Sequence, residues 1–505
     1  MKKVTLLFFA LIAPISAILT GCGGGGSDGS GANLLTTATM NSTLPASSGL
    51  SNLCQAPRSG SDPYNNNLAY PDKAGTLALE KAWLRSWTDE TYLWYREVPT
   101  TLNPANYTTA IDYFNVLKTS AITASGKAKD QFHFTYPSAE WDALSQQGLE
   151  FGYGFTWSRA PGNSLPRKRV VAILEPGSPA DKAGLKRGDQ LITVDGADYL
   201  NGNDSTTITK LNAGIFPETE GEAHTFVFKR DGNNLTFTMI ATNVATTPVQ
   251  NTKTIDTPTG KVGYMTFNSH NSVSELQLIN AINTFKTAGI SDLVLDLRYN
   301  GGGLLYVASE LAYMIAGPVN TNGKIFEQTK FNDKTKPEAP TPFLSSAYGF
   351  SAPKGQALPY LGLKKLSILT SAGTCSASEA IINSLQGIDI EVVLIGATTC
   401  GKPYGFYPTP NCGTTYFTIQ FKGVNNKGFG DYADGIAATC NVADDFTHAL
   451  GDTAEGQLAA ALKYNSTKIC PVVSSGAKLQ GESEPTKLQL VRPLGKEIAI
   501  YSRLQ

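Results

Sequence analysis

The chain has 505 residues, 41% of them hydrophobic, and a formal net charge of −1 at pH 7. A chain of this length exceeds one ordinary hydrophobic core, so we expect about two or three domains. The near-zero charge lacks the basic excess of a nucleic-acid-binding protein, and four histidines leave few metal ligands. These properties predict a multidomain globular protein that does not bind nucleic acid.

The N-terminus predicts export. Residues 1–21 combine a positively charged start, an apolar run and small residues, which is typical of a secretory signal peptide. The segment LTGC, which ends at Cys22, resembles the lipobox of bacterial lipoproteins. This resemblance implies cleavage before Cys22, lipidation of its sulfur and, because Gly23 follows, sorting to the outer membrane of a Gram-negative bacterium. The alternative is an ordinary signal peptide or an uncleaved anchor. Residues 22–53, rich in Gly and Ser, predict a flexible tether.

Six more cysteines follow the lipobox: Cys54, Cys375, Cys400, Cys412, Cys440 and Cys470. An even number of cysteines in an exported chain predicts up to three disulfides. Cys400 and Cys412 flank a turn rich in Gly and Pro, so we expect these two to pair.

Residues 54–145 predict a small helical N-terminal domain. Apolar and aromatic residues recur at roughly helical spacing from Leu79 to Trp94, before Pro99 ends the pattern. A second helix is expected over residues 109–119. Such an aromatic stripe is more often core than a ligand site.

Residues 146–246 predict a β-rich module. The segment RVVAILEPGSPADKAGLKRGDQLITVDG indicates a strand, a short helix, a turn and a second strand, with Ser178 as the helix cap and Pro179 at its first position. The segment AHTFVFKRDGNNLTFTMIA predicts a hairpin that turns at residues 231–233.

Two segments of this module resemble a PDZ domain of the kind found in bacterial proteases. They are GYGF, which is Gly152, Tyr153, Gly154 and Phe155, and SPADKAGLKRGDQLITVDG. The resemblance implies that backbone N–H groups of the GYGF loop hold the terminal carboxylate of a peptide. It also implies that the adjacent strand edge accepts the peptide as an added strand.

Residues 247–470 alternate strands and helices. The runs KVGYMTF, DLVLDLR, KLSILT and EVVLIG are typical of buried strands, and the helix between the first two ends at Gly289. This order predicts an α/β core with a largely parallel sheet. Residues 471–505 are expected to form a polar tail with one terminal strand, KEIAIYS.

A serine stands where the strand KLSILT passes into a helix. A hydroxyl at Ser376 would lie at the positive end of the helix dipole, beside free N–H groups that could hold an oxyanion. Its base could be Lys402, which ends the next strand unit. No Asp or Glu occurs from residue 392 to 419, so no local carboxylate would stabilise the charged form of this amine. Histidine bases stay open as alternatives, because catalytic groups converge only in space: His133, His224, His270 and His448.

The core segments resemble the tail-specific, or C-terminal processing, serine peptidases. The likeness rests on LVLDLRYNGGGLL, GTCSASEAIINSL and GATTCGKPYG, and extends over roughly residues 79–462. It implies a ClpP/crotonase-like α/β protease core, a PDZ domain that presents substrate, and a Ser/Lys dyad that requires no metal or other cofactor.

Matching positions imply the residue roles. Ser376 would be the nucleophile and Lys402 the base. The backbone N–H of Gly303, with Gly302 as a close rival, would supply one half of an oxyanion hole, and the N–H of Ala377 the other half.

One position departs from the family pattern. Many relatives carry a Gln four residues after the lysine, where it orients the amine, whereas this chain has Phe406. Something else must then position Lys402. Cys375 and Cys400 lie close to the dyad in sequence, so their oxidation state could influence its geometry. Alternatively, Ser376 is only a helix cap and Lys402 a solvated turn lysine.

The pattern as a whole predicts an exported, lipid-anchored serine endopeptidase that acts on C-terminal or unfolded tails of polypeptides. The alternative is a catalytically inactive lipoprotein that binds peptides or hydrophobic ligands on the same fold. A third interpretation, as a surface adhesin or a nutrient-capture lipoprotein, is supported only by the predicted tether and lipid anchor.

Overall fold

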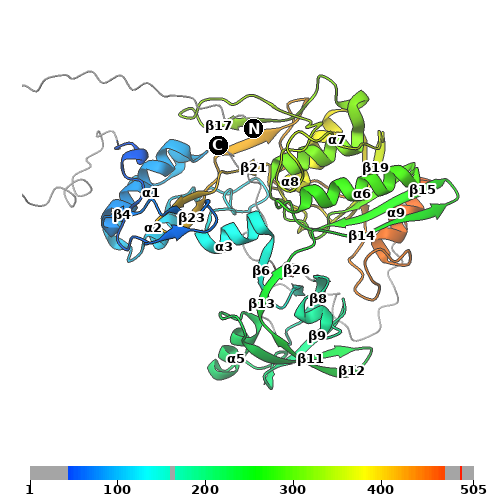
Figure 1. Cartoon of the computed structure of the whole chain (residues 1–505), viewed down its shortest axis with the longest axis horizontal. Coiled ribbons are helices and arrows are strands. Elements are labelled where there is room, and N and C mark those ends of the chain that lie inside the picture. Colours follow the sequence, from blue (N-terminus) through cyan, green and yellow to red (C-terminus); the bar gives the residue numbers. More distant parts are fainter. Residues whose placement is uncertain (1–43, 160–164, 472–488, 492–505) are drawn as a thin grey trace, which may run out of the picture. The chain divides into compact units, whose positions relative to one another are not determined.

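The computed structural model describes residues 44–159 and 165–471, together with a short strand at 489–491 (Figure 1). The predicted signal peptide, Cys22 and most of the tether lie outside the described residues, as does the predicted strand KEIAIYS. Within the described ranges, no helix has the length and apolar character needed to cross a membrane.

The N-terminal part contains the two expected helices, α1 (Leu77–Thr91) and α2 (Ala110–Val116). The first helix ends earlier than the aromatic pattern predicts, because Tyr92 leaves the helix with extended backbone angles. Its hydroxyl donates a hydrogen bond to the Asp130 carboxylate at 2.7 Å, which holds it out of the helix.

This part is not purely helical, contrary to the prediction. Its described residues also contain five short helical segments and five short strands: η1 (Ser47–Gly49), η2 (Tyr95–Glu97), η3 (Pro104–Asn106), α3 (Ser138–Asp142), η4 (Ala143–Gln147), β1 (Leu53–Cys54), β2 (Ser61–Asp62), β3 (Leu68–Ala69), β4 (Lys73–Ala74) and β5 (Phe134–Pro137). Strand β5 pairs with β23 (Thr414–Phe417), which in turn pairs with β22 (Thr409–Asn411). A strand from the N-terminal part therefore completes a sheet built by the far end of the chain.

The β-rich module contains one main sheet with the strand order β12-β11-β9-β8-β7-β26. Its strands are β7 (Phe155–Arg159), β8 (Arg169–Leu174), β9 (Gln190–Val194), β11 (Ala223–Arg230), β12 (Asn233–Ile240) and β26 (Gln489–Val491), and β10 (Ala197–Asp198) pairs with β9. The predicted hairpin is confirmed as β11 and β12. Strands β6 (Leu149–Gly152) and β13 (Thr242–Ala245) form a separate antiparallel pair.

The described residues of this module form two helices. The predicted short helix is α4 (Pro179–Lys182), and the Ser178 side chain caps it by accepting the N–H of Asp181. The second helix, α5 (Ser205–Ile215), was not predicted.

The α/β core has the expected, largely parallel sheet, in the order β14-β15-β16-β19-β20-β25. Its strands are β14 (Val249–Thr257), β15 (Gly260–Phe267), β16 (Asp292–Asp296), β19 (Lys365–Thr370), β20 (Glu391–Gly396) and β25 (Cys440–Asn441). All neighbours from β15 onward are parallel, whereas β14 is antiparallel. The core helices are α6 (Ser274–Ala288), α7 (Leu305–Thr321), α8 (Ala377–Gly387) and α9 (Gly456–Thr467). Figure 1 shows α6, α7 and α8 close together on one side of this sheet.

This sheet positions the candidate site. Strands β16, β19 and β20 are adjacent and parallel, so the loops that follow them leave the same edge. The loop after β16 carries the NGGG segment, the loop after β19 leads to α8, and the loop after β20 leads to Lys402. A smaller sheet has the strand order β18-β17-β24-β21. Its strands are β17 (Ile325–Phe331), β18 (Thr341–Pro342), β21 (Tyr404–Gly405) and β24 (Phe421–Val424).

Three disulfides are present, as the cysteine count predicts: Cys54–Cys412, Cys375–Cys400 and Cys440–Cys470. The expected Cys400–Cys412 pair is wrong. Strand pairing explains why, because β19 and β20 lie side by side and bring Cys375 next to Cys400. Cys412 instead lies in the turn between β22 and β23, and it bonds to the N-terminal part of the chain.

Candidate active site

Ser376 lies at the junction between the β19 loop and α8, as predicted, and has an unusual backbone. It is the N-cap of α8, with φ 57° and ψ −116°. A non-glycine residue with positive φ is uncommon, and such conformations concentrate at functional sites. The side chain is 2% exposed, and its Oγ has no hydrogen-bond partner among the described residues. A buried hydroxyl without a partner is costly in a purely structural role.

Lys402 is buried as well, at 1% exposure. Its Nζ lies 4.7 Å from the ring centre of Phe132 and 4.5 Å from that of Phe406. The residue that replaces the family's glutamine therefore packs against the amine with its ring face, together with an aromatic residue from the N-terminal part. Both rings exclude water from this lysine.

Ser376 and Lys402 line one small cavity of about 10 Å³. The other lining residues are Leu305, Glu327, Ala380, Pro403, Tyr404, Phe421 and Tyr432. The predicted nucleophile and base are thus brought together. Glu327, on β17, is one of these lining residues, so the tertiary structure supplies an acidic neighbour that the local sequence lacks. A carboxylate close to an amine favours its charged form.

Glu379 connects the serine loop to the lysine loop, and sequence reasoning missed it. Its carboxylate accepts the backbone N–H groups of Ser376 at 2.9 Å, Gly401 at 2.9 Å and Lys402 at 2.8 Å. It also accepts the Thr399 hydroxyl at 2.6 Å. Burial raises the pKa of this carboxyl, while the four donors oppose that rise. The S-x-x-E spacing at the start of α8 was the available signal, since an acidic third residue commonly bonds back to the N-cap N–H.

Substituting glutamine for Glu379 should destabilise the protein by about 3 kcal/mol, because an amide presents an NH₂ group to donors that need an acceptor. Denaturant unfolding measures this loss. The matched control is Glu391→Gln, since Glu391 is exposed and forms a surface ion pair with Lys468. This variant should stay within about 0.5 kcal/mol of wild type. Equal stabilities of the two variants would contradict the anchoring role of Glu379.

The glycine-rich loop lies directly against Ser376. A Cβ built on Gly302, where φ is +102°, would come 2.8 Å from the Ser376 Cβ and 2.9 Å from the Ala377 N. Only glycine fits there. The Gly302 N–H donates to the Asn300 Oδ1 at 2.9 Å. Among the described residues, no hydrogen bond uses the N–H of Gly303 or of Ala377. Of the two rival glycines, Gly303 therefore keeps its donor available.

None of the four histidines lines the Ser376 cavity. His270 donates through Nδ1 to the Asn300 Oδ1 at 3.0 Å, and burial lowers its pKa to about 3. His133 contacts the Phe114 carbonyl and the Thr418 hydroxyl, and burial lowers its pKa to about 4. Both imidazoles are neutral parts of the packing.

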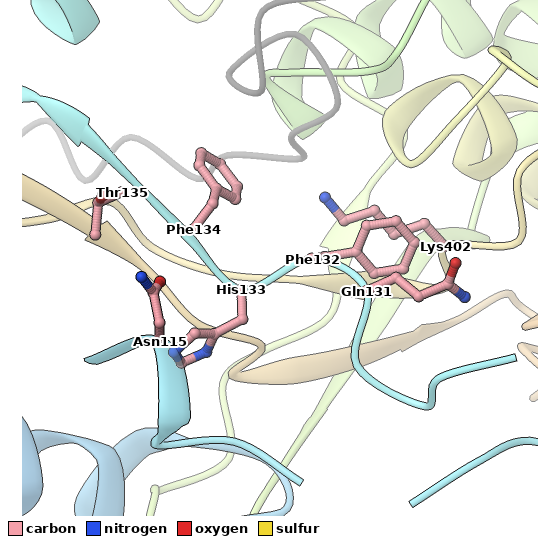
Figure 2. A pocket seen from close by; sticks show the side chains of 7 residues that line it. All are labelled: Asn115, Gln131, Phe132, His133, Phe134, Thr135 and Lys402. Atoms are coloured by element: carbon pink, nitrogen blue, oxygen red, sulfur yellow. The ribbon is translucent and has the colours of Figure 1, made fainter. Parts of the chain in front are cut away.

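Lys402 also lines a larger cavity of about 280 Å³ (Figure 2). Its lining residues are Asn115, Gln131, Phe132, His133, Phe134, Thr135 and Lys402. Asn115 and Gln131 are exposed, whereas the aromatic side chains and Lys402 are buried. The cavity thus leads from a polar mouth to an apolar interior beside the amine.

The predicted peptide-binding residues lie at the start of β7. Gly152 ends β6, Tyr153 and Gly154 form the turn, and Phe155 begins β7. A Cβ on Gly154 would come 2.2 Å from the Ser178 Cβ, so this loop packs closely on the start of α4. The N–H groups of Tyr153 and Gly154 make no hydrogen bond within the described part of the chain.

The described residues contain one cluster with metal-ligand side chains: Cys375, Glu379 and Cys400. Because the two sulfurs are joined in a disulfide, this cluster offers no thiolate and only one carboxylate.

Two family profiles match the chain. Residues 261–413 match Peptidase family S41, and residues 80–134 match the Peptidase S41 N-terminal domain. The chain is 28% identical over 251 residues to a carboxyl-terminal-processing protease of Picosynechococcus, which covers 48% of this chain and 52% of the relative. It is 27% identical over 237 residues to the carboxy-terminal processing protease CtpA of Bacillus subtilis, which covers 46% and 44% respectively. The chain spans about half the length of these curated relatives.

A solved structure is similar over most of the chain. It carries the name S41 protease and comes from Bacteroides fragilis, with a TM-score of 0.60 and 25% identity, covering 79% of this chain and 98% of that one. The resemblance to the C-terminal processing peptidases is confirmed by these comparisons, as is a multidomain α/β architecture.

Proposed function

From this chain's place among the C-terminal processing peptidases of family S41, we propose that it is a serine endopeptidase with Ser376 as nucleophile and Lys402 as base. One observation carries the proposal. The Ser376 Oγ, which has no hydrogen-bond partner in the described part of the chain, lines the same cavity as the buried Lys402 at the edge of the parallel sheet. The alternative of an inactive binding lipoprotein is not favoured, because the matched relatives are named as proteases.

The chemistry follows from this arrangement. Lys402 takes the hydroxyl proton, and the Ser376 oxygen attacks the peptide carbonyl carbon. The N–H groups of Gly303 and Ala377 stabilise the tetrahedral oxyanion. The lysine then protonates the leaving amine, and water hydrolyses the acyl-enzyme. The burial of Lys402 favours the neutral amine that this step needs. The ring faces of Phe132 and Phe406 and the acidic neighbour Glu327 favour the charged form instead.

The site is closed to substrate in this conformation. A cavity of about 10 Å³ is near the lower limit for one water molecule, and a peptide carbonyl needs more room. Cleavage therefore requires movement of residues that line this cavity, which include Tyr404, Phe421 and Tyr432. The larger cavity beside Lys402 offers space for one substrate side chain.

The substrates we propose are C-terminal or unfolded polypeptide tails, captured by the PDZ-like module of residues 146–246. The N–H groups of Tyr153 and Gly154, which have no hydrogen-bond acceptor among the described residues, suit a terminal carboxylate. We further propose that Cys22 anchors the protein by a lipid in the cell envelope, in the outer membrane of a Gram-negative bacterium. Three disulfides are consistent with such an oxidising compartment.

A covalent probe tests the assignment. A fluorophosphonate, added with a peptide that has a free C-terminus, should label wild type at Ser376, and mass spectrometry should locate the adduct. Neither Ser376→Ala nor Lys402→Ala should be labelled, since the first lacks the oxygen and the second lacks the base. The control is Ser378→Ala, which should be labelled as wild type is. Labelling of Ser376→Ala at wild-type level would remove the assignment.

A further inference from the structure

The edge strand of the β-rich module already has an occupant, which is the chain's own C-terminal segment. Strand β26 pairs antiparallel with β7, with Gln489 opposite Arg159, Leu490 opposite Ser158 and Val491 opposite Trp157. The other side of β7 pairs with β8. Strand β26 therefore occupies the outer edge of β7, where an incoming peptide would otherwise bond.

The direction of this pairing matches that of a captured peptide tail. Val491 lies opposite Trp157, which is nearer than Arg159 to the GYGF loop. The segment consequently runs toward the loop whose Tyr153 and Gly154 N–H groups make no hydrogen bond within the described residues. A substrate that adds a strand to this edge and directs its carboxylate to the same loop would need the same backbone donors and acceptors.

We propose that Gln489–Val491 is a resident self-ligand of the β7 edge, which a substrate tail must displace before it can bind. This inference rests on the proposed peptide capture by the same module. The occupant is attached through residues 472–488 to the core. A covalently attached ligand competes at an effective concentration on the order of millimolar for short linkers. Weak substrate tails are thereby excluded, and only tails that bind well or are abundant reach the edge.

The test uses the full-length chain with Ser376→Ala, so that cleavage cannot interfere. The probe is a fluorescent peptide that copies residues 486–494 of this chain, and anisotropy measures its Kd. Adding Leu490→Pro and Val491→Pro removes whichever of these two N–H groups donates to β7, because alternate residues of an antiparallel strand face the neighbouring strand and proline has no N–H to donate. The peptide should then bind roughly tenfold tighter or more than it binds the parent.

The matched control is Leu490→Ile with Val491→Ile, which keeps both N–H groups and should bind the peptide as weakly as the parent does. A second measurement follows hydrogen exchange of the Phe155–Arg159 amides. Their protection should fall in the proline variant and return when the peptide is added. Equal affinity of the parent and the proline variant, or no binding to either, would overturn the self-ligand.

Failure of the self-ligand proposal can be distinguished from failure of the peptidase assignment. In the catalytically competent chain, the two prolines should lower KM for a tail-bearing substrate and leave kcat unchanged. If wild type cleaves nothing but the proline effect on binding appears, the peptidase assignment fails and the self-ligand stands. If wild type cleaves tails but the prolines change neither Kd nor KM, the self-ligand fails alone.

Discussion

Replacing Ser376 by alanine is expected to lower kcat by about 10⁴-fold or more, because no other group in the cavity can form the acyl-enzyme. The fold should be unaffected. The Oγ makes no hydrogen bond among the described residues, and alanine carries the same Cβ through the same positive φ. Hydrolysis of an unfolded protein substrate and thermal unfolding, measured on the same preparation, check both parts.

The matched control is Ser378→Ala, two residues along α8. The Ser378 Oγ donates to the Asn300 carbonyl at 3.1 Å, so its loss should cost about 1 kcal/mol of stability while cleavage persists. The two serines should thus show opposite patterns, one losing activity and the other losing stability. Undiminished proteolysis by Ser376→Ala would exclude it as nucleophile.

The largest effect on stability is expected at Arg298, which is fully buried in the loop that follows β16. Its guanidinium bonds to the carboxylates of Asp296 at 3.0 Å, Glu455 at 2.7 Å and Asp444 at 2.9 Å. Arg298→Met would leave these acids in the interior without their counter-charge, so we expect a loss of about 3–5 kcal/mol in denaturant unfolding.

The candidate active site should also be affected by the loss of the Arg298 ion pairs. The carbonyl of Arg298 accepts the Ser371 hydroxyl, and the preceding carbonyl, of Leu297, accepts the Thr374 hydroxyl at 2.8 Å. The backbone of Leu297 and Arg298 therefore holds the turn that leads to Ser376, and the Arg298 ion pairs anchor this backbone. The control is Arg96→Met, because Arg96 pairs with Asp333 at the surface and should change stability by less than about 0.5 kcal/mol.

A compensating variant sharpens the test at Arg298. Adding Asp296→Asn and Glu455→Gln to Arg298→Met removes two of the buried carboxylates that lack a counter-charge. This should recover part of the lost stability. No recovery would mean that the loss of Arg298 acts through packing rather than through uncompensated charge.

The strand-and-helix order of the core was readable from the sequence, because local patterns carry it. Buried runs such as KLSILT and EVVLIG predict β19 and β20, and Gly289 predicts the end of α6, which it caps with φ 67°. The hairpin of β11 and β12 follows from its turn residues. The extent of α1 was not readable, since the bond from Tyr92 to Asp130 joins residues 38 positions apart.

The candidate dyad was readable for a similar reason. Ser376 heads a helix after one strand, Lys402 follows the next strand, and parallel neighbours end at the same edge. The surroundings of Ser376 and Lys402 could not be predicted from the sequence. Glu327, Phe132 and the β5–β23 pairing come from distant segments, and each depends on how those segments pack.

The amino-acid sequence by itself determined which segments become strands and helices, and which serine and lysine lie at the sheet edge, because hydrophobic periodicity and turn residues act over a few positions. Only the tertiary structure decided the cysteine pairing and the aromatic and acidic surroundings of Lys402. It also decided the hydrogen bonds by which Glu379 joins the serine loop to the lysine loop, and the pairing of Gln489–Val491 with the edge of β7. Contacts between distant segments depend on the free energy of packing the whole chain, and no local pattern in the sequence records that quantity.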